Sequence, residues 1–271
     1  MFKSILVGLF DEEHSLAAMQ QAICLARKEG AKALGVYVVD EEELVPPMGT
    51  EAVSPQRHRA EMEPRLRDLG RKCLDEFAIF CADAGVEADT KFLVGPMVKS
   101  VCELARTVDL IVLGRIEKTM RRGLLMNCCF FEDVVRRVSR PVMVAATQPR
   151  EIKRVLIAYD GREGASKALA TAAHFAADLG LPLTVATVAE RNVGPADLLE
   201  ARSYLEPYGL DVKLLLLEGN PVNEILRAAT RQDADLIVMG TYCHGRAQEL
   251  VFGGTLWQVI KKADRPVLVC C

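Results

Sequence analysis

Hydrophobic and polar positions follow the same order in the two halves of the chain. Residues 2–8 (FKSILVG) align with 152–158 (IKRVLIA), and at the same offset residues 30–38 align with 180–188 without a gap. In each half a β-branched apolar run, which predicts a buried strand, is followed by apolar positions three and four residues apart, which predict a helix. The chain therefore contains an internal duplication, which constrains the fold more than any single motif does.

The alternation of strand and helix patterns continues through both halves. After the first pair, strands are predicted at 34–39, 89–94, 110–114 and 142–144 in the first half, and at 183–188, 212–217, 236–240 and 267–269 in the second. Helices are predicted between them, and Gly30 and Gly180 stand where a C-cap glycine belongs. Only the first half has a long insertion, 40–65, which is expected to be an irregular loop because it contains Pro46, Pro47 and Pro55.

The fold class follows from the strand patterns. Apolar strands without polar alternation are typical of a parallel sheet that helices cover on both faces. We therefore expect an α/β chain of two tandem, doubly wound, five-stranded parallel-sheet domains of Rossmann-like type, residues 1–147 and 151–271, joined by a short linker. Ligands of such sheets bind beyond the carboxyl ends of the strands, so the segments that follow the strands are the expected location of a site.

Charge and apolar content narrow the classes of partner. The 34 basic and 37 acidic residues leave a formal charge of −3, too balanced to predict general affinity for nucleic acid. The apolar stretch at the start is interrupted by Gly8 and Asp11, and it is too short for a signal sequence or a membrane span. We expect a cytoplasmic protein whose partners are neither nucleic acids nor membranes.

The nine cysteines lack the spacing of a disulfide framework, which favours reduced thiols. Four of them, Cys24, Cys73, Cys81 and Cys102, fall on apolar stripes of predicted helices. The adjacent pairs 128–129 and 270–271 do not have the spacing of zinc ligands, so no metal is predicted. A spatial cluster of Cys243, His244 and one pair remains open as an alternative, as does a redox role.

Two glycine-containing segments of the second half follow the first and fourth strands. They are Ala158-Tyr159-Asp160-Gly161 and Gly240-Thr241-Tyr242-Cys243-His244-Gly245, and the second continues to Phe252-Gly253-Gly254-Thr255. Glycine lets a loop bring its amides against phosphate oxygens, and a helix that begins at Gly254-Thr255 would point its positive end at the same anion. Each glycine alone is more simply a turn residue, but together with Asp160 the set predicts a nucleotide site.

These segments resemble the universal stress protein family. Its nucleotide-binding members carry Gly-x2-Gly-x9-Gly-Ser/Thr after the fourth strand and Asp-Gly after the first. The resemblance covers both halves, and its marks are 156–161 (LIAYDG), 219–221 (GNP), 234–240 (ADLIVMG), 252–254 (FGG) and 265–269 (RPVLV). It implies an adenine nucleotide alpha hydrolase-like fold and a cytoplasmic stress-response protein of the tandem class, whose domains pair through their last strands. Some members hold ATP or AMP and others hold none.

By position, Gly240 and Gly253 match the first and third glycines of the motif, whereas Cys243 replaces the second. Gly254 stands where the motif has Ser or Thr, and Thr255 comes directly after it. The resemblance also places Asp160 near the adenosine and Val188 near the base. The candidate binding residues are Ala158, Tyr159, Asp160, Gly161, Val188, Met239, Gly240, Thr241, Cys243, His244, Gly245, Gly253, Gly254 and Thr255. His244 either faces phosphate or is an exposed loop histidine.

The first half departs further from this motif. Its Asp-Gly position reads Phe10-Asp11, Gly114 remains, and the later glycines are replaced around residues 127–129. The basic residues Arg115, Lys118, Arg121 and Arg122 are more simply a solvated loop than an anion site. Nucleotide is therefore expected in the second half only.

No catalytic motif is present. The chain lacks a Gly-x-Gly-x-x-Gly segment after the first strand, a Gly-x-x-x-x-Gly-Lys-Ser/Thr loop and a Gly-x-Ser-x-Gly elbow, so an enzyme is not predicted. We predict regulatory binding of ATP or AMP in the second domain, with a pseudo-dimer of the two domains and homodimer formation left open. The alternatives are a nucleotide-free scaffold that acts through protein partners and a weak ATPase.

Charged runs in the insertion and the segment after it are expected to be solvated surface. They are the acidic run 40–43 and the basic positions Arg57, Arg59, Arg65 and Arg67, and a partner-docking surface is the alternative.

Overall fold

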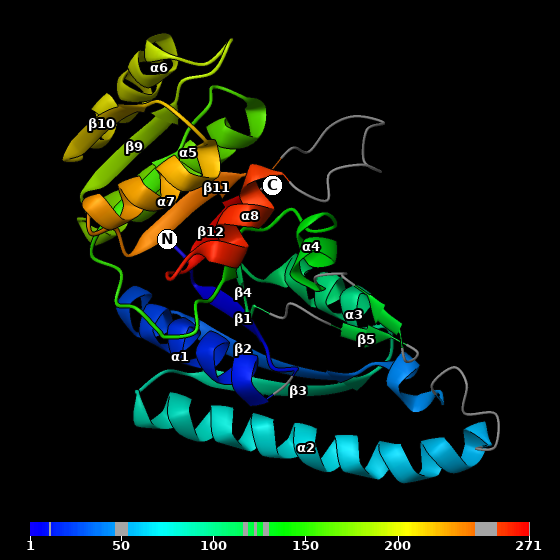
Figure 1. Ribbon diagram of the computed structural model, residues 1–271. Helices are drawn as coiled ribbons and strands as arrows, with labels where there is room; N and C mark the ends of the chain where they lie inside the picture. Colours follow the sequence, from blue (N-terminus) through cyan, green and yellow to red (C-terminus); the bar gives the residue numbers. More distant parts are fainter. Residues whose placement is uncertain are drawn as a thin grey trace. The chain divides into compact units, whose positions relative to one another are not determined.

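The computed structural model describes residues 1–10, 12–46, 54–115, 119–121, 124–126, 130–241 and 254–270. They form two compact units, Phe2–Arg140 and Pro141–Cys271, with Met1 grouped with the second. Each unit has the α/β architecture that the sequence predicts, a sheet dominated by parallel strands with helices between them (Figure 1). Among the described residues no helix is long and apolar enough to cross a bilayer.

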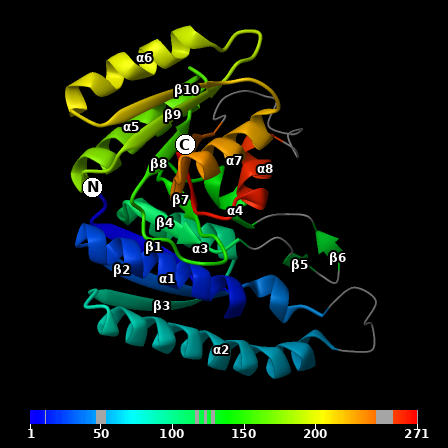
Figure 2. The same cartoon turned by 60° about the vertical axis from the view of Figure 1, so that its left-hand side comes forward.

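The unit Phe2–Arg140 contains four parallel strands in the order β4-β1-β2-β3. The strands are β1 (Ser4–Gly8), β2 (Lys32–Val39), β3 (Ala88–Val94) and β4 (Leu110–Leu113). The helices are α1 (Glu12–Glu29), α2 (Pro55–Asp83), α3 (Met97–Leu104) and α4 (Phe130–Val135), with short 3-10 turns η1 (Glu41–Leu44) and η2 (Ala105–Thr107). A separate antiparallel hairpin, β5 (Thr119–Arg121) with β6 (Leu124–Met126), was not predicted (Figure 2).

The unit Pro141–Cys271 contains five parallel strands in the order β10-β9-β8-β11-β12. The strands are β8 (Val155–Ala158), β9 (Leu183–Val188), β10 (Val212–Leu217), β11 (Leu236–Gly240) and β12 (Val267–Cys270). The helices are α5 (Glu163–Leu179), α6 (Pro195–Leu205), α7 (Pro221–Arg231) and α8 (Thr255–Lys262), with the 3-10 turn η3 (Glu206–Tyr208).

Strand β7 (Val142–Val144) belongs by its contacts to this second unit, although it ends the first repeat in the sequence. It pairs antiparallel with β12, with Met143 opposite Leu268. The last strand of one repeat therefore pairs with the last strand of the other, and this antiparallel pair is the exception in an otherwise parallel sheet.

The glycine helix ends predicted from the sequence are confirmed. Gly30 and Gly180 have φ values of 62° and 61°, the left-handed conformation that glycine adopts without a steric cost. The N–H of Gly180 donates to the carbonyls of Ala176 and Ala177, which closes α5. Both helices thus end where the apolar spacing ends.

The prediction of an irregular loop through residue 65 is wrong, because α2 begins at Pro55. Proline is favoured at the first helical position, where its missing N–H has no intrahelical partner to lose. Ser54 precedes it as the N-cap, and its hydroxyl accepts a 3.2 Å hydrogen bond from the Arg57 N–H. The basic face predicted here is exposed, but Arg57 pairs with Glu61 and Arg59 with Glu63, so it is partly neutralised.

The cysteine prediction holds for the helix interiors. Cys73 and Cys81 are buried, and Cys24 and Cys102 are half-buried. Burial raises the pKa of Cys81 to about 11, so its thiol stays protonated and packs as an apolar group.

Candidate functional site

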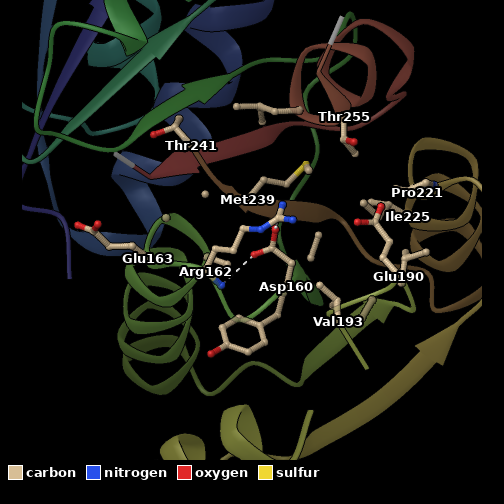
Figure 3. Close-up of a pocket in the computed structure, with 18 residues that line it drawn as sticks. Asp160, Arg162, Glu163, Glu190, Val193, Pro221, Ile225, Met239, Thr241 and Thr255 are labelled. Carbon is tan, nitrogen blue, oxygen red and sulfur yellow. Dashed lines mark hydrogen bonds and ion pairs between the residues drawn. The ribbon is translucent and has the colours of Figure 1, made fainter. Parts of the chain in front are cut away.

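A pocket of about 300 Å³ opens at the carboxyl ends of β8, β9 and β11 in the second unit (Figure 3). Its volume lies at the lower end of the roughly 300–1,000 Å³ that is usual for small-molecule sites. Its floor is apolar, with Val188 from the end of β9, Met239 from β11 and Ile225 from α7. The position of the pocket is the one that the topology of a parallel sheet favours for a ligand.

Three helices line the pocket with residues at or near their N-termini. Glu163, Gly164 and Ala165 come from α5, Pro221 and Ile225 from α7, and Thr255 and Leu256 from α8. The N-terminus of a helix carries a partial positive charge and N–H groups that point away from the helix, and both favour an anion. The pocket therefore combines apolar side chains with helix N-termini, which favour a negatively charged group.

The first turn of α5 touches the end of β11 through backbone atoms. A Cβ atom added to Gly164 would meet the carbonyl of Thr241, whose carbon would lie 2.9 Å away. A Cβ atom added to Gly240 would in turn meet the backbone of Gly164 and Ala165. Glycine at both positions is what allows the helix to begin this close to the strand, and so to line the pocket.

The turn after β8 sets the position of Asp160. Gly161 has a φ of 72°, which strains any residue with a side chain, and a Cβ atom there would also displace the carboxylate of Asp197. The chain turns back so that the Arg162 N–H donates to Asp160 Oδ1 over 3.1 Å, and Arg162 Nη1 donates to Oδ2 over 3.1 Å. Both side chains line the pocket and remain exposed to solvent.

Tyr159 lines the pocket, but most of its surface is buried in the protein. It is 3% exposed, its carbonyl accepts a 2.9 Å hydrogen bond from Thr187 Oγ1, and its hydroxyl donates to Glu200. Burial raises the pKa of Tyr159, the hydrogen bond with Ser166 lowers it, and the neighbouring carboxylates of Glu200 and Asp197 raise it, with a net increase. The tyrosine therefore stays a neutral donor that fixes the end of β8.

The structure brings most of the described candidate residues together. Those that line the pocket are Ala158, Tyr159, Asp160, Val188, Met239, Gly240, Thr241 and Thr255. Gly161 and Gly254 do not line it: the first forms the turn after β8 and the second is the N-cap of α8. Cys243, His244, Gly245 and Gly253 lie outside the described residues.

Several lining residues were missed by the sequence analysis, chiefly Arg162, Gly164, Glu190, Val193 and Ile225. Glu190 and Val193 follow directly after the strand 183–188, so their nearness to a strand end was a usable signal. Ile225 lies in the second turn of α7, and its side chain reaches the pocket from there. Arg162 and Gly164 had no such signal, because their placement depends on where α5 begins.

The same position in the first repeat is filled by an aromatic side chain. Phe10, which aligns with Asp160, packs edge to face against Phe130 in the first turn of α4, with ring centroids 4.8 Å apart. A Cβ atom added to Gly8 would meet the Phe10 ring and would lie 2.7 Å from Leu113 Cδ2, so the ends of β1 and β4 are closely packed there. Apolar packing thus replaces the acidic side chain of the second repeat.

Ligands for a metal ion do not gather anywhere in the described part of the chain, where no group of three His, Cys, Asp or Glu side chains is suitably arranged. The acidic residues of the pocket, Asp160, Glu163 and Glu190, do not form such a group.

A match to one protein family is found in both halves of the chain. The model of the universal stress protein family matches residues 1–146, 151–206 and 194–270. A universal stress protein of Synechocystis sp. is 31% identical over 189 residues, which cover 68% of this chain and 66%, just under two thirds, of that protein.

Solved structures of the same family resemble this chain in fold. A universal stress protein from Archaeoglobus fulgidus covers 98% of this chain and 95% of its own, with a TM-score of 0.78 and 22% identity. A Pseudomonas aeruginosa protein assigned to this family covers 99% of this chain and 93% of its own, with a TM-score of 0.60 and 18% identity.

Proposed function

The chain belongs to the universal stress protein family in its tandem form, and we propose that its second repeat binds an adenine nucleotide, ATP or AMP, in the pocket between β8, β9 and β11. The observation that carries the proposal is the composition of this pocket, where apolar walls for a base lie beside three helix N-termini for phosphate.

Each part of an adenine nucleotide has a matching group in the pocket. Val188, Ile225 and Met239 supply apolar contacts for the base. The carboxylate of Asp160 is placed to accept hydrogen bonds from ribose hydroxyls. The first turns of α5 and α8, with the hydroxyl of Thr255, are the candidates for contact with phosphate. We assign the binding to the second repeat alone, because Phe10 takes the place of the acidic side chain in the first.

The proposed role is regulatory binding without turnover, in the cytoplasm. A bound nucleotide changes the protein only if two states of the pocket region differ in their affinity for it. Binding therefore has to be measured together with a change in the protein, such as its protection from proteolysis. Phosphate release that increases in proportion to protein concentration would instead support the weak ATPase.

The first experiment identifies the ligand. The protein is purified, denatured, and the released small molecules are analysed by mass spectrometry, while AMP and ATP are titrated into ligand-free protein by calorimetry. A carried adenine nucleotide, or binding heat at one site per chain, is expected. The absence of both would contradict the proposal and favour the nucleotide-free scaffold.

A substitution locates the site. Asp160→Ala removes a solvent-exposed carboxylate, so the fold is preserved, and AMP is expected to bind about 10-fold more weakly because a charge-assisted hydrogen bond is lost. The matched control is Asp211→Ala, which removes another exposed carboxylate of the same unit, outside the pocket. Equal affinity in both variants would place the nucleotide elsewhere.

A further inference from the structure

One cation lines the described part of the pocket, the guanidinium of Arg162. It comes from the N-cap residue of α5, whose φ of −84° and ψ of 164° are extended and not helical. Figure 3 shows the guanidinium between the Asp160 carboxylate and the Met239 side chain, inside the ring of lining residues. A positive charge is thus part of the pocket lining.

One partner of this cation is Asp160, and the pair is accessible to water. Arg162 Nη1 lies 3.1 Å from Asp160 Oδ2, and the two side chains are 48% and 38% exposed. Ion pairs with this exposure contribute little to stability, because water competes for both groups. Loss of this one ion pair therefore costs little, so another anion can replace Asp160 Oδ2 beside the guanidinium, while the backbone N–H of Arg162 continues to hold Asp160 Oδ1.

The other charges of the described lining are acidic. Glu163 pairs with Lys167 at 3.3 Å, and Glu190 lies across the pocket from Asp160 (Figure 3). A phosphate group that entered while Arg162 was still paired with Asp160 would meet the carboxylate of Glu190 without a compensating side-chain cation in this part of the lining. The helix N-termini would then be the favourable charges left for it.

On the premise that the pocket binds an adenine nucleotide, we propose that Arg162 leaves Asp160 on binding and contacts the phosphate, which makes it the residue that distinguishes a nucleotide from a nucleoside. The planar guanidinium donates two parallel hydrogen bonds to phosphate oxygens, a geometry that a lysine does not reproduce. Asp160 Oδ2 is released at the same time and becomes an acceptor for ribose. One exchange of partners thus prepares both polar ends of the site.

The test compares AMP with adenosine on three variants by calorimetry. In Arg162→Gln, AMP is expected to bind at least about 10-fold more weakly, because a charge-assisted contact is lost. Adenosine is not expected to bind more weakly in this variant, since it has no phosphate and Asp160 is free to accept its ribose. Arg162→Lys is expected to restore part of the AMP affinity. The matched control is Arg227→Gln, which removes an arginine of the same unit that pairs with Glu224 and does not line the pocket.

The outcomes separate this inference from the function on which it rests. If the unchanged protein binds neither AMP nor adenosine, the proposed function fails. If it binds both and Arg162→Gln weakens both equally, or neither, Arg162 does not select for phosphate. If Arg162→Gln tightens both ligands, the arginine obstructs the pocket, and the proposal is overturned.

Discussion

The backbone of Gly164 lies against that of Gly240, so that neither residue has room for a β-carbon. Gly240 ends β11 and Gly164 is in the first turn of α5, two elements that are far apart in the sequence. Their contact holds the positive end of α5 at the mouth of the pocket. The glycine that follows the fourth strand therefore has a packing role, in addition to any contact with a ligand.

Replacing Gly164 with alanine is expected to destabilise the second unit by about 1–3 kcal/mol or more, because the obstructing atoms are backbone atoms that cannot swing away. In the interior of an ordinary helix, replacing glycine with alanine stabilises the helix by up to about 1 kcal/mol. The free energy of unfolding is measured by urea denaturation. Gly194→Ala is the control, since an added Cβ there meets nothing within 4 Å. Equal stability of the two variants would show that α5 can shift away from β11.

Replacing Phe10 with alanine is expected to destabilise the first unit and to leave one nucleotide bound per chain. The ring contacts Phe130 and is half-buried, so the loss is expected to be less than the roughly 3–5 kcal/mol of a fully buried phenylalanine. Thermal unfolding and calorimetric stoichiometry are the measurements. Phe80→Ala, which removes a ring that is 42% exposed, is expected to change stability little. A second bound nucleotide in Phe10→Ala would mean that the first unit can bind nucleotide and that only the Phe10 ring prevents it.

The central strands of the sheet could be predicted closely because they are buried. The expected strand 236–240 coincides with β11, whose apolar residues are buried, and the expected strand 212–217 coincides with β10, although that strand is partly exposed and contains Lys213. The start of α2 could not be predicted in the same way. Pro55 is compatible both with a loop and with the first turn of a helix, and only the cap at Ser54 distinguishes the two.

The candidate site was predictable where residues follow strands directly. Asp160, Val188 and Thr241 converge because the carboxyl ends of parallel strands lie at one edge of the sheet. Arg162 was missed because its place in the pocket depends on the tight turn at Gly161 and on the first residue of α5, which sequence patterns locate only approximately. The contact between Phe10 and Phe130 joins residues that no local pattern relates.

The Cys81 thiol is expected to resist alkylation in the folded protein. It is fully buried, so the reagent cannot reach it. Burial also raises its pKa to about 11, so the reactive thiolate is scarce. Folded protein is treated with iodoacetamide at mildly alkaline pH, and modified cysteines are mapped by mass spectrometry. The same treatment in urea is the control and should modify Cys81 fully. Rapid modification without urea would mean that the α2 region opens readily.

Asp109 is expected to stabilise the first unit at neutral pH, and this contribution is expected to be lost in acid. Partial burial on its own raises the pKa of this carboxyl group, but hydrogen bonds from Lys3 N, Ser4 N and Ser4 Oγ, with the charge of Arg140, outweigh burial, and the net pKa is lowered. A carboxyl group whose pKa is lower in the folded state stabilises the protein above its unfolded value of 3.8, and that contribution is lost as the pH falls through the folded value.

Asp109→Asn is therefore expected to reduce the free energy of unfolding at neutral pH by about 1–3 kcal/mol, the worth of charge-assisted hydrogen bonds. The difference from the unchanged protein should narrow below about pH 4, where the unfolded carboxyl group becomes protonated. Urea denaturation at a series of pH values measures both quantities. Asp83→Asn, at the end of α2, is the control for the loss of one negative charge. A difference that stays constant down to the lowest pH would show that Asp109 acts through its shape and not through its charge.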